Sequence, residues 1–118
     1  MADQTQRYLD QLEPRTRFAG YVLISALRNA GAPAVIVANG GLRTYDQQQL
    51  LVAQGRSRTL RSKHLEGRAF DIDLLGWNRD NIPAAFWEIV GPWAEKELGL
   101  VWGGRWVNPY DPGHFETT

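Results

Sequence analysis

The chain of 118 residues contains no cysteine, no excess of charge of either sign and no long hydrophobic run. The lack of cysteine excludes disulfides, cysteine nucleophiles and thiolate metal sites, so any metal must be held by nitrogen and oxygen ligands. Thirteen Lys and Arg residues balance thirteen Asp and Glu residues. The overall charge therefore gives no indication of a nucleic-acid partner or an anionic membrane. Since no apolar stretch approaches the roughly 18 residues of a membrane span, we expect no membrane anchor.

The sequence also shows no targeting signal and no linker between domains. Its first residues are polar, without the basic start and apolar middle of a secretory signal. No repeat, low-complexity tract or Pro/Gly/Ser linker interrupts the sequence. Hydrophobic residues make up 43% and charged residues 22% of the chain, as in globular proteins. The sequence predicts one monomeric domain over residues 1–118, made without a signal peptide.

Helices are expected in three places. The first runs over residues 15–30 and ends at Gly31, and its predicted apolar face consists of Phe18, Val22, Ala26 and Leu27. A second helix follows Thr44, which has the spacing of a capping box with Gln47, and ends near Gln54. A third contains Phe86, Ile89, Val90 and Trp93 at helical spacing, and we expect Gly91-Pro92 to kink or restart it.

Short strands are expected between and after these helices. The β-branched run 34–38 predicts a buried strand, and 100–102 and 114–116 are candidate closing strands. In residues 69–75, Asp71 and Asp73 alternate with apolar residues, which puts the acidic side chains on one strand face. Because regular βαβ alternation is missing, the pattern predicts an α+β fold in which a small, largely antiparallel sheet packs with helices.

The candidate chemistry lies in segments 62–71 and 110–116, which contain both histidines of the chain. Ligand atoms on a tetrahedral zinc lie about 3.3 Å apart. The seven-residue spacing of His64 and Asp71 corresponds to roughly 10 Å along a helix and roughly 23 Å along a strand. The chain must therefore reverse between them, and Gly67 permits the positive φ of such a reversal.

The second segment predicts a carboxylate beside an imidazole. Pro112-Gly113 suits the centre of a type II turn, which would bring Asp111 and His114 within about 7 Å. In a hydrolytic zinc site the imidazole binds the metal and the carboxylate takes a proton from the water. Two histidines and one carboxylate, with a fourth position for water, are a known ligand set of catalytic zinc sites.

These segments resemble the Ser-x-His-x-x-Gly-x-Ala-x-Asp and Asp-x-x-His-Phe-Glu motifs of the zinc D-alanyl-D-alanine carboxypeptidase and L-alanyl-D-glutamate endopeptidase family. Hedgehog and lysostaphin-type peptidases share the plan of its site. Segment 41–48 resembles the Gly-x-Arg-Ser/Thr segment of the family, and the similarity covers roughly residues 39–116. The resemblance implies the hedgehog/D-Ala-D-Ala peptidase-like form of the α+β fold.

The resemblance also implies roles for individual residues. It places zinc on His64, Asp71 and His114, with Asp111 as the catalytic base. Arg43 would stabilise the oxyanion or bind a substrate carboxylate. Ser62 is a candidate substrate-binding residue, with a plain hydrogen-bonding role as the alternative.

Asp111 matches the base of several phage endolysins of the family, which is an aspartate, whereas many dipeptidases of the family have a glutamate at this position. The resemblance therefore implies an endolysin that cuts L-alanyl-D-glutamate bonds in peptidoglycan stem peptides during host lysis. Such a protein would stay in the host cytoplasm until it is released to the periplasm and cell wall. A D-Ala-D-Ala carboxypeptidase and a non-catalytic, hedgehog-like zinc-binding domain remain alternatives.

Three further features keep two interpretations each. Trp106, our candidate for a wall of the substrate groove, and Trp102 flank a Gly-Gly pair and are equally suited to core packing. Glu116 either orients His114 or a neighbouring strand, or forms an ordinary hydrogen bond. A basic stretch, consisting of Arg56, Arg58, Arg61, Lys63 and Arg68, is either a solvated loop or attracts the carboxylates of cell-wall stems.

Overall fold

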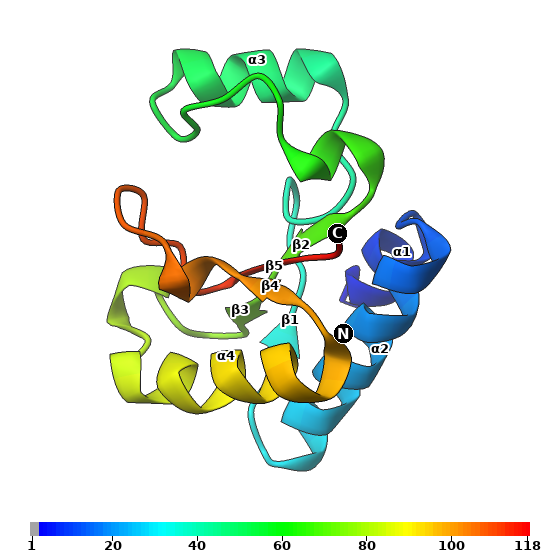
Figure 1. Ribbon diagram of the computed structural model, residues 1–118, viewed down its shortest axis with the longest axis vertical. Coiled ribbons are helices and arrows are strands. Elements are labelled where there is room, and N and C mark those ends of the chain that lie inside the picture. Colours follow the sequence, from blue (N-terminus) through cyan, green and yellow to red (C-terminus); the bar gives the residue numbers. More distant parts are fainter. Residues whose placement is uncertain (1–2) are drawn as a thin grey trace.

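Two small antiparallel sheets lie between helices in the computed structural model, which describes residues 3–118 (Figure 1). The α-helices are α1 (Thr5–Asp10), α2 (Pro14–Asn29), α3 (Tyr45–Ala53) and α4 (Ala84–Leu98). The strands are β1 (Ala34–Val35), β2 (Ala69–Asp71), β3 (Asp73–Leu74), β4 (Val101–Trp102) and β5 (His114–Glu116). Single 3-10 turns form η1 (Lys63–Glu66), η2 (Arg79–Asn81) and η3 (Gly103–Arg105). The predicted α+β class is confirmed.

The strand pairing brings the two candidate segments together. β5 lies between β2 and β4, and β1 pairs with β3, all antiparallel. In the β2–β5 register Asp71 is the partner of His114, and Phe70 is the partner of Phe115. The two phenylalanines are fully buried and their rings stack at 5.8 Å. Because side chains alternate along a strand, this core contact places Asp71 and His114 together on the other face.

The predicted strand 69–75 is divided, because β2 and β3 pair with different partners. Its alternation is still confirmed: Phe70, Ile72 and Leu74 are buried in the core. The strand predicted over 34–38 is shorter than expected, since only Ala34 and Val35 are paired.

The bounds predicted for α2 differ from the structure by one residue at each end, but its predicted apolar face is largely wrong, because only Leu27 of its four residues is buried. Phe18 is 69% exposed, and the buried residues are Thr16, Ala19, Gly20, Leu23, Ile24 and Leu27. Small and polar residues are buried on this face because the elements packed against it leave no room for a side chain at one position and supply a hydrogen-bond partner at another. A Cβ on Gly20 would lie 2.5 Å from the Leu9 side chain, and Thr16 shares a buried hydrogen bond with Thr117.

The alternative that the third helix restarts at Gly91-Pro92 is also wrong, since α4 is one helix with Pro92 inside it. Pro92 has no N–H to donate to the Glu88 carbonyl, but Glu88 is exposed, where water can bind that carbonyl. The predicted face is partly wrong, because Ile89 is 74% exposed. The buried residues of α4 are Trp87, Val90, Gly91 and Ala94.

Gly91 is required by its contact with Trp102. A Cβ at this position would lie 2.2 Å from the Trp102 ring. We expect Gly91→Ala to lower the free energy of unfolding by about 1–3 kcal/mol, although alanine favours helix by about 1 kcal/mol. Urea unfolding, with Ser25→Ala on the exposed side of α2 as control, measures the effect. A Gly91→Ala variant as stable as wild type would contradict this packing.

Within residues 3–118, none of the helices combines the length and the apolar composition that crossing a bilayer requires.

Candidate metal centre and active site

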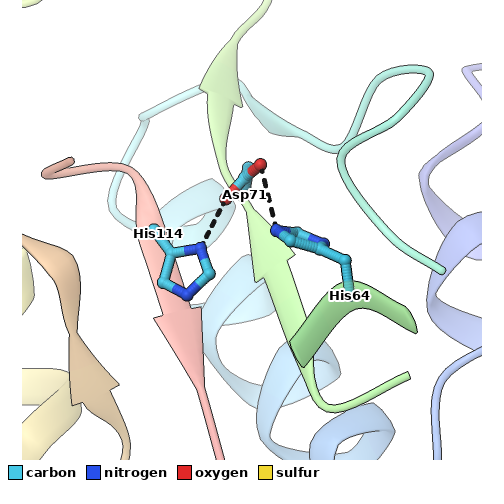
Figure 2. A group of neighbouring side chains, drawn as sticks. All are labelled: His64, Asp71 and His114. Carbon is cyan, nitrogen blue, oxygen red and sulfur yellow. Dashed lines mark hydrogen bonds and ion pairs between the residues drawn. The ribbon is translucent and has the colours of Figure 1, made fainter. Parts of the chain in front are cut away.

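Both histidines and Asp71 converge on one point, as Figure 2 shows. His64 comes from η1, Asp71 from the end of β2 and His114 from the start of β5. His64 Nε2 lies 3.3 Å from Asp71 Oδ2, and His114 Nδ1 lies 3.0 Å from Asp71 Oδ1. One ligand atom of each residue lies within 4.8 Å of the other two, so the group could hold a metal ion. The structure thus brings the three predicted ligands together.

A tight turn places His64 on this site. The Ser62 hydroxyl accepts a hydrogen bond from the His64 N–H (3.1 Å) and begins η1. Gly67 ends the turn in the left-handed region at φ 68°, where a side chain would be strained. The reversal predicted between His64 and Asp71 is confirmed.

The outer ring nitrogens of the two histidines are held by acceptors. His64 Nδ1 lies 2.8 Å from the Gly41 carbonyl oxygen, and His114 Nε2 lies 2.8 Å from Glu116 Oε1. Because a carbonyl and a carboxylate only accept, these outer nitrogens carry the protons. In neutral rings the inner nitrogens therefore turn lone pairs toward the Asp71 carboxylate. That arrangement is repulsive unless a proton or a cation lies between them, so the donor set fits a metal cation.

The pKa values of His114 and Asp71 agree with this interpretation. Burial lowers the pKa of His114, but hydrogen bonds to Asp71 and Glu116 outweigh this effect and raise it to about 9. Burial raises the pKa of Asp71, but the hydrogen bond from His114 and the contact with His64 hold it well below its usual range. Asp71 is therefore an anion and His114 holds a proton that a metal would displace.

Glu116 accepts a hydrogen bond from His114, which favours the interpretation that it orients this ring. We expect Glu116→Ala to weaken metal binding by about 10-fold to 100-fold, because a ligating histidine loses the acceptor that fixes its ring. Glu116→Gln should have a smaller effect, since its amide oxygen still accepts. Competition with a chromophoric chelator measures the affinity, with the exposed Glu88→Ala as control. Equal affinity in Glu116→Ala and wild type would contradict the orienting role.

Asp111 lies beside His114 on a braced turn. The His114 N–H donates to the Asp111 carbonyl (3.2 Å), and the Trp102 indole N–H donates to the Pro112 carbonyl (2.7 Å). The predicted proximity is confirmed, but the predicted type II turn is wrong, since Gly113 does not have positive φ. Glycine is needed there for space, because a Cβ would lie 2.8 Å from the Ile72 carbonyl oxygen.

The Asp111 carboxylate is accessible to solvent and has a raised pKa. Its side chain is 47% exposed, and Oδ2 lies 4.0 Å from His114 Nδ1. Partial burial and the nearby Asp71 charge raise the pKa of Asp111. A half-exposed carboxylate with a raised pKa is well suited to accept and release a proton.

Arg43 is held rigidly next to the predicted ligands. Its guanidinium lies 3.2 Å from Asp71 Oδ2 and donates to the Asn39 carbonyl (2.7 Å) and Gln48 Oε1 (3.0 Å). Its side chain is only 12% exposed. Sequence reasoning missed two of these partners. Asn39 has a positive φ of 68°, signalled only by the Asn-Gly-Gly run, and Gln48 is a fully buried polar residue of α3.

A cavity of about 760 Å³ opens at this site. Its lining includes His64, Asp71, His114, Arg43 and Asp111, as well as the predicted substrate-binding residues Ser62 and Trp106. The Trp106 ring lies 4.9 Å from the His114 ring, whereas Trp102 is buried in the core. Arg79, which also lines the cavity and pairs with Asp73, had no signal in the sequence.

Comparison with known proteins finds similar peptidases, both among curated sequences and among solved structures. The curated L-alanyl-D-glutamate peptidase of Listeria phage A118 is 27% identical over 113 residues, which are 92% of this chain. The chain spans 38% of the length of that relative. The crystal structure of the L-Ala D-Glu endopeptidase ChiX of Serratia marcescens is 28% identical, with a TM-score of 0.71 over 100% of this chain and 89% of that chain.

A second structure, the LD-carboxypeptidase LdcB, has a TM-score of 0.70 over 100% of this chain and 73% of its own; at 19% identity, this similarity shows a shared fold alone. The family model described as D-alanyl-D-alanine carboxypeptidase matches residues 55–117. This match covers more than half of the chain and includes the segments of His64, Asp71, Asp111 and His114. The chain belongs to the D-alanyl-D-alanine carboxypeptidase family of peptidases.

Proposed function

We propose that this protein is a zinc-dependent peptidase that hydrolyses L-alanyl-D-glutamate bonds in peptidoglycan stem peptides. The observation that carries the proposal is the convergence of His64, Asp71 and His114 beside Asp111 in one cavity. The substrate class is supported by the two relatives named as L-alanyl-D-glutamate peptidases. We further propose that residues 1–118 act as one monomeric catalytic domain of a phage endolysin, which reaches the wall from the host cytoplasm at lysis.

Zinc suits this donor set better than magnesium or calcium, which prefer oxygen ligands. His64 through Nε2, His114 through Nδ1 and a carboxylate oxygen of Asp71 would hold it. When bound, zinc would supply Lewis acidity, which polarises a peptide carbonyl and makes water acidic enough to attack at neutral pH.

Other residues of the cavity would transfer protons, stabilise charge and bind the substrate. Asp111 would accept the proton of the attacking water and pass it to the leaving amine, for which its position beside His114 is suited. Arg43 would add a fixed positive charge where the carbonyl oxygen becomes negative, because its three hydrogen bonds hold the guanidinium in place. Ser62 and Trp106 would contact the substrate from the cavity wall.

Mass spectrometry of digested peptidoglycan tests this proposal. We expect zinc-loaded protein to release fragments with new L-alanine carboxyl ends and new D-glutamate amino ends. EDTA should stop the reaction and zinc should restore it. Removal of terminal D-alanine alone would favour a carboxypeptidase. Zinc binding without any cleavage would favour a non-catalytic zinc domain.

A further inference from the structure

Four unpaired cations lie close together in the cavity lining. They belong to residues 56–63, here called the basic segment: Arg56, Arg58, Arg61 and Lys63. None of the four forms a salt bridge with another residue in the range 3–118. Arg68, the fifth residue of the basic stretch in the sequence, does not belong to this lining and contacts Glu66 and the Thr118 carbonyl.

The cavity is cationic although the chain as a whole is neutral. No Asp or Glu occurs between Asp46 and Glu66. Six cations line the cavity against three carboxylates, and those carboxylates lie beside the histidines. Arg43 pairs with Asp71 and Arg79 with Asp73. The charge left for a ligand is therefore that of the basic segment.

The basic segment is held in place from α3. Buried Gln48 donates through Nε2 to the Ser57 hydroxyl (2.9 Å) and to the Thr59 carbonyl (2.6 Å). The backbone N–H groups of Arg56 and Ser57 donate to the Leu51 carbonyl at 2.8 and 3.2 Å. A backbone fixed in this way loses less conformational entropy when a ligand binds.

The same glutamine connects the basic segment to the candidate metal ligands. Gln48 Oε1 accepts from Arg43 Nη1, and Arg43 Nη2 lies 3.2 Å from Asp71. Two side chains thus link Asp71 to the backbone of the basic segment. The backbone that carries the four cations is therefore held at a set position relative to the candidate metal ligands.

We infer that the basic segment binds a free carboxylate of the substrate next to the scissile bond. The protein then selects stem peptides whose D-glutamate keeps its carboxylate outside the main chain over peptides in which this group is a carboxamide. Arginine binds a carboxylate through charge-assisted hydrogen bonds that an amide cannot replace. The inference rests on the proposed function, because it assigns the substrate of the same site.

Two short peptides test it, each containing one L-Ala-D-Glu bond and a blocked carboxyl end. They differ only in whether the D-glutamate side group is a carboxylate or a carboxamide. The basic-segment variant carries Arg56→Gln, Arg58→Gln and Arg61→Gln. The matched control carries Arg7→Gln, Arg15→Gln and Lys96→Gln, three exposed cations outside the cavity. KM and kcat are measured for wild type, the basic-segment variant and the control. Binding of each peptide without cleavage is measured by calorimetry on Asp111→Asn protein.

Wild type and the control should prefer the carboxylate peptide, with a KM about 10-fold to 100-fold lower than for the carboxamide. The basic-segment variant should lose this preference with little change in kcat, and added salt should weaken only binding of the carboxylate peptide. Equal binding and cleavage of both peptides by wild type would overturn the inference and leave the proposed function standing. Cleavage of neither peptide would overturn both.

Discussion

Asp71→Ala is expected to abolish metal binding and to lower the hydrolysis rate by at least about 10³-fold, because a ligand is lost along with the charge that the site needs. The Asp71 carboxylate contacts both histidines and Arg43. Without it, one Arg43 N–H loses its acceptor, and the site loses the one carboxylate that lies against both histidines. Equilibrium dialysis with zinc and a peptidoglycan turbidity assay measure the two losses.

Asp73→Ala is the matched control for this experiment. Asp73 is two residues away, at the start of β3, and its carboxylate pairs with Arg79 outside the histidine cluster. We expect this variant to bind zinc like wild type. Zinc bound with unchanged affinity by Asp71→Ala would show that the metal is held elsewhere.

Asp111→Asn is expected to keep zinc and to lower kcat by about 10² to 10⁴-fold, as loss of a general base does. Asparagine preserves the shape of the turn, whose hydrogen bonds come from the backbone of Asp111 and from Trp102. Its amide cannot take a proton from water. Stopped assays on the L-Ala-D-Glu peptide and a parallel zinc titration separate chemistry from binding.

The exposed Asp80→Asn variant controls for a change of one charge. It should leave both kcat and zinc affinity at the wild-type level. If Asp111→Asn hydrolysed the peptide as fast as wild type, another group would have to serve as base. If it lost zinc, Asp111 would belong to the metal site.

The sequence predicted the candidate site well where short-range geometry and motif spacing decide. The capping box of Thr44 and Gln47 is present as predicted, because both partners lie within one helical turn. Gly67 has the expected positive φ. The alternation around Asp71 is confirmed, since burial of Phe70 and Ile72 fixes which way the carboxylate points.

Features that depend on distant packing were predicted less well. Most of the buried face of α2 was missed because Thr16 pairs with Thr117, 101 residues away, and Gly20 receives the Leu9 side chain. Gly91 suggests a helix break in isolation, whereas in the fold it makes room for Trp102.

The connection from Asp71 through Arg43 and Gln48 to the basic segment was likewise not predicted from the sequence. Its members come from β2, the loop before α3, α3 itself and the loop that follows. Only the tertiary fold shows that they form one network.

The most direct test of the metal site is a crystal structure of zinc-loaded protein with anomalous data at the zinc edge. We expect a single strong peak within about 2.3 Å of His64 Nε2, His114 Nδ1 and a carboxylate oxygen of Asp71. Glu116 should remain bonded to the other nitrogen of His114. A peak at any other group of residues, or zinc bound through His114 Nε2, would contradict this account.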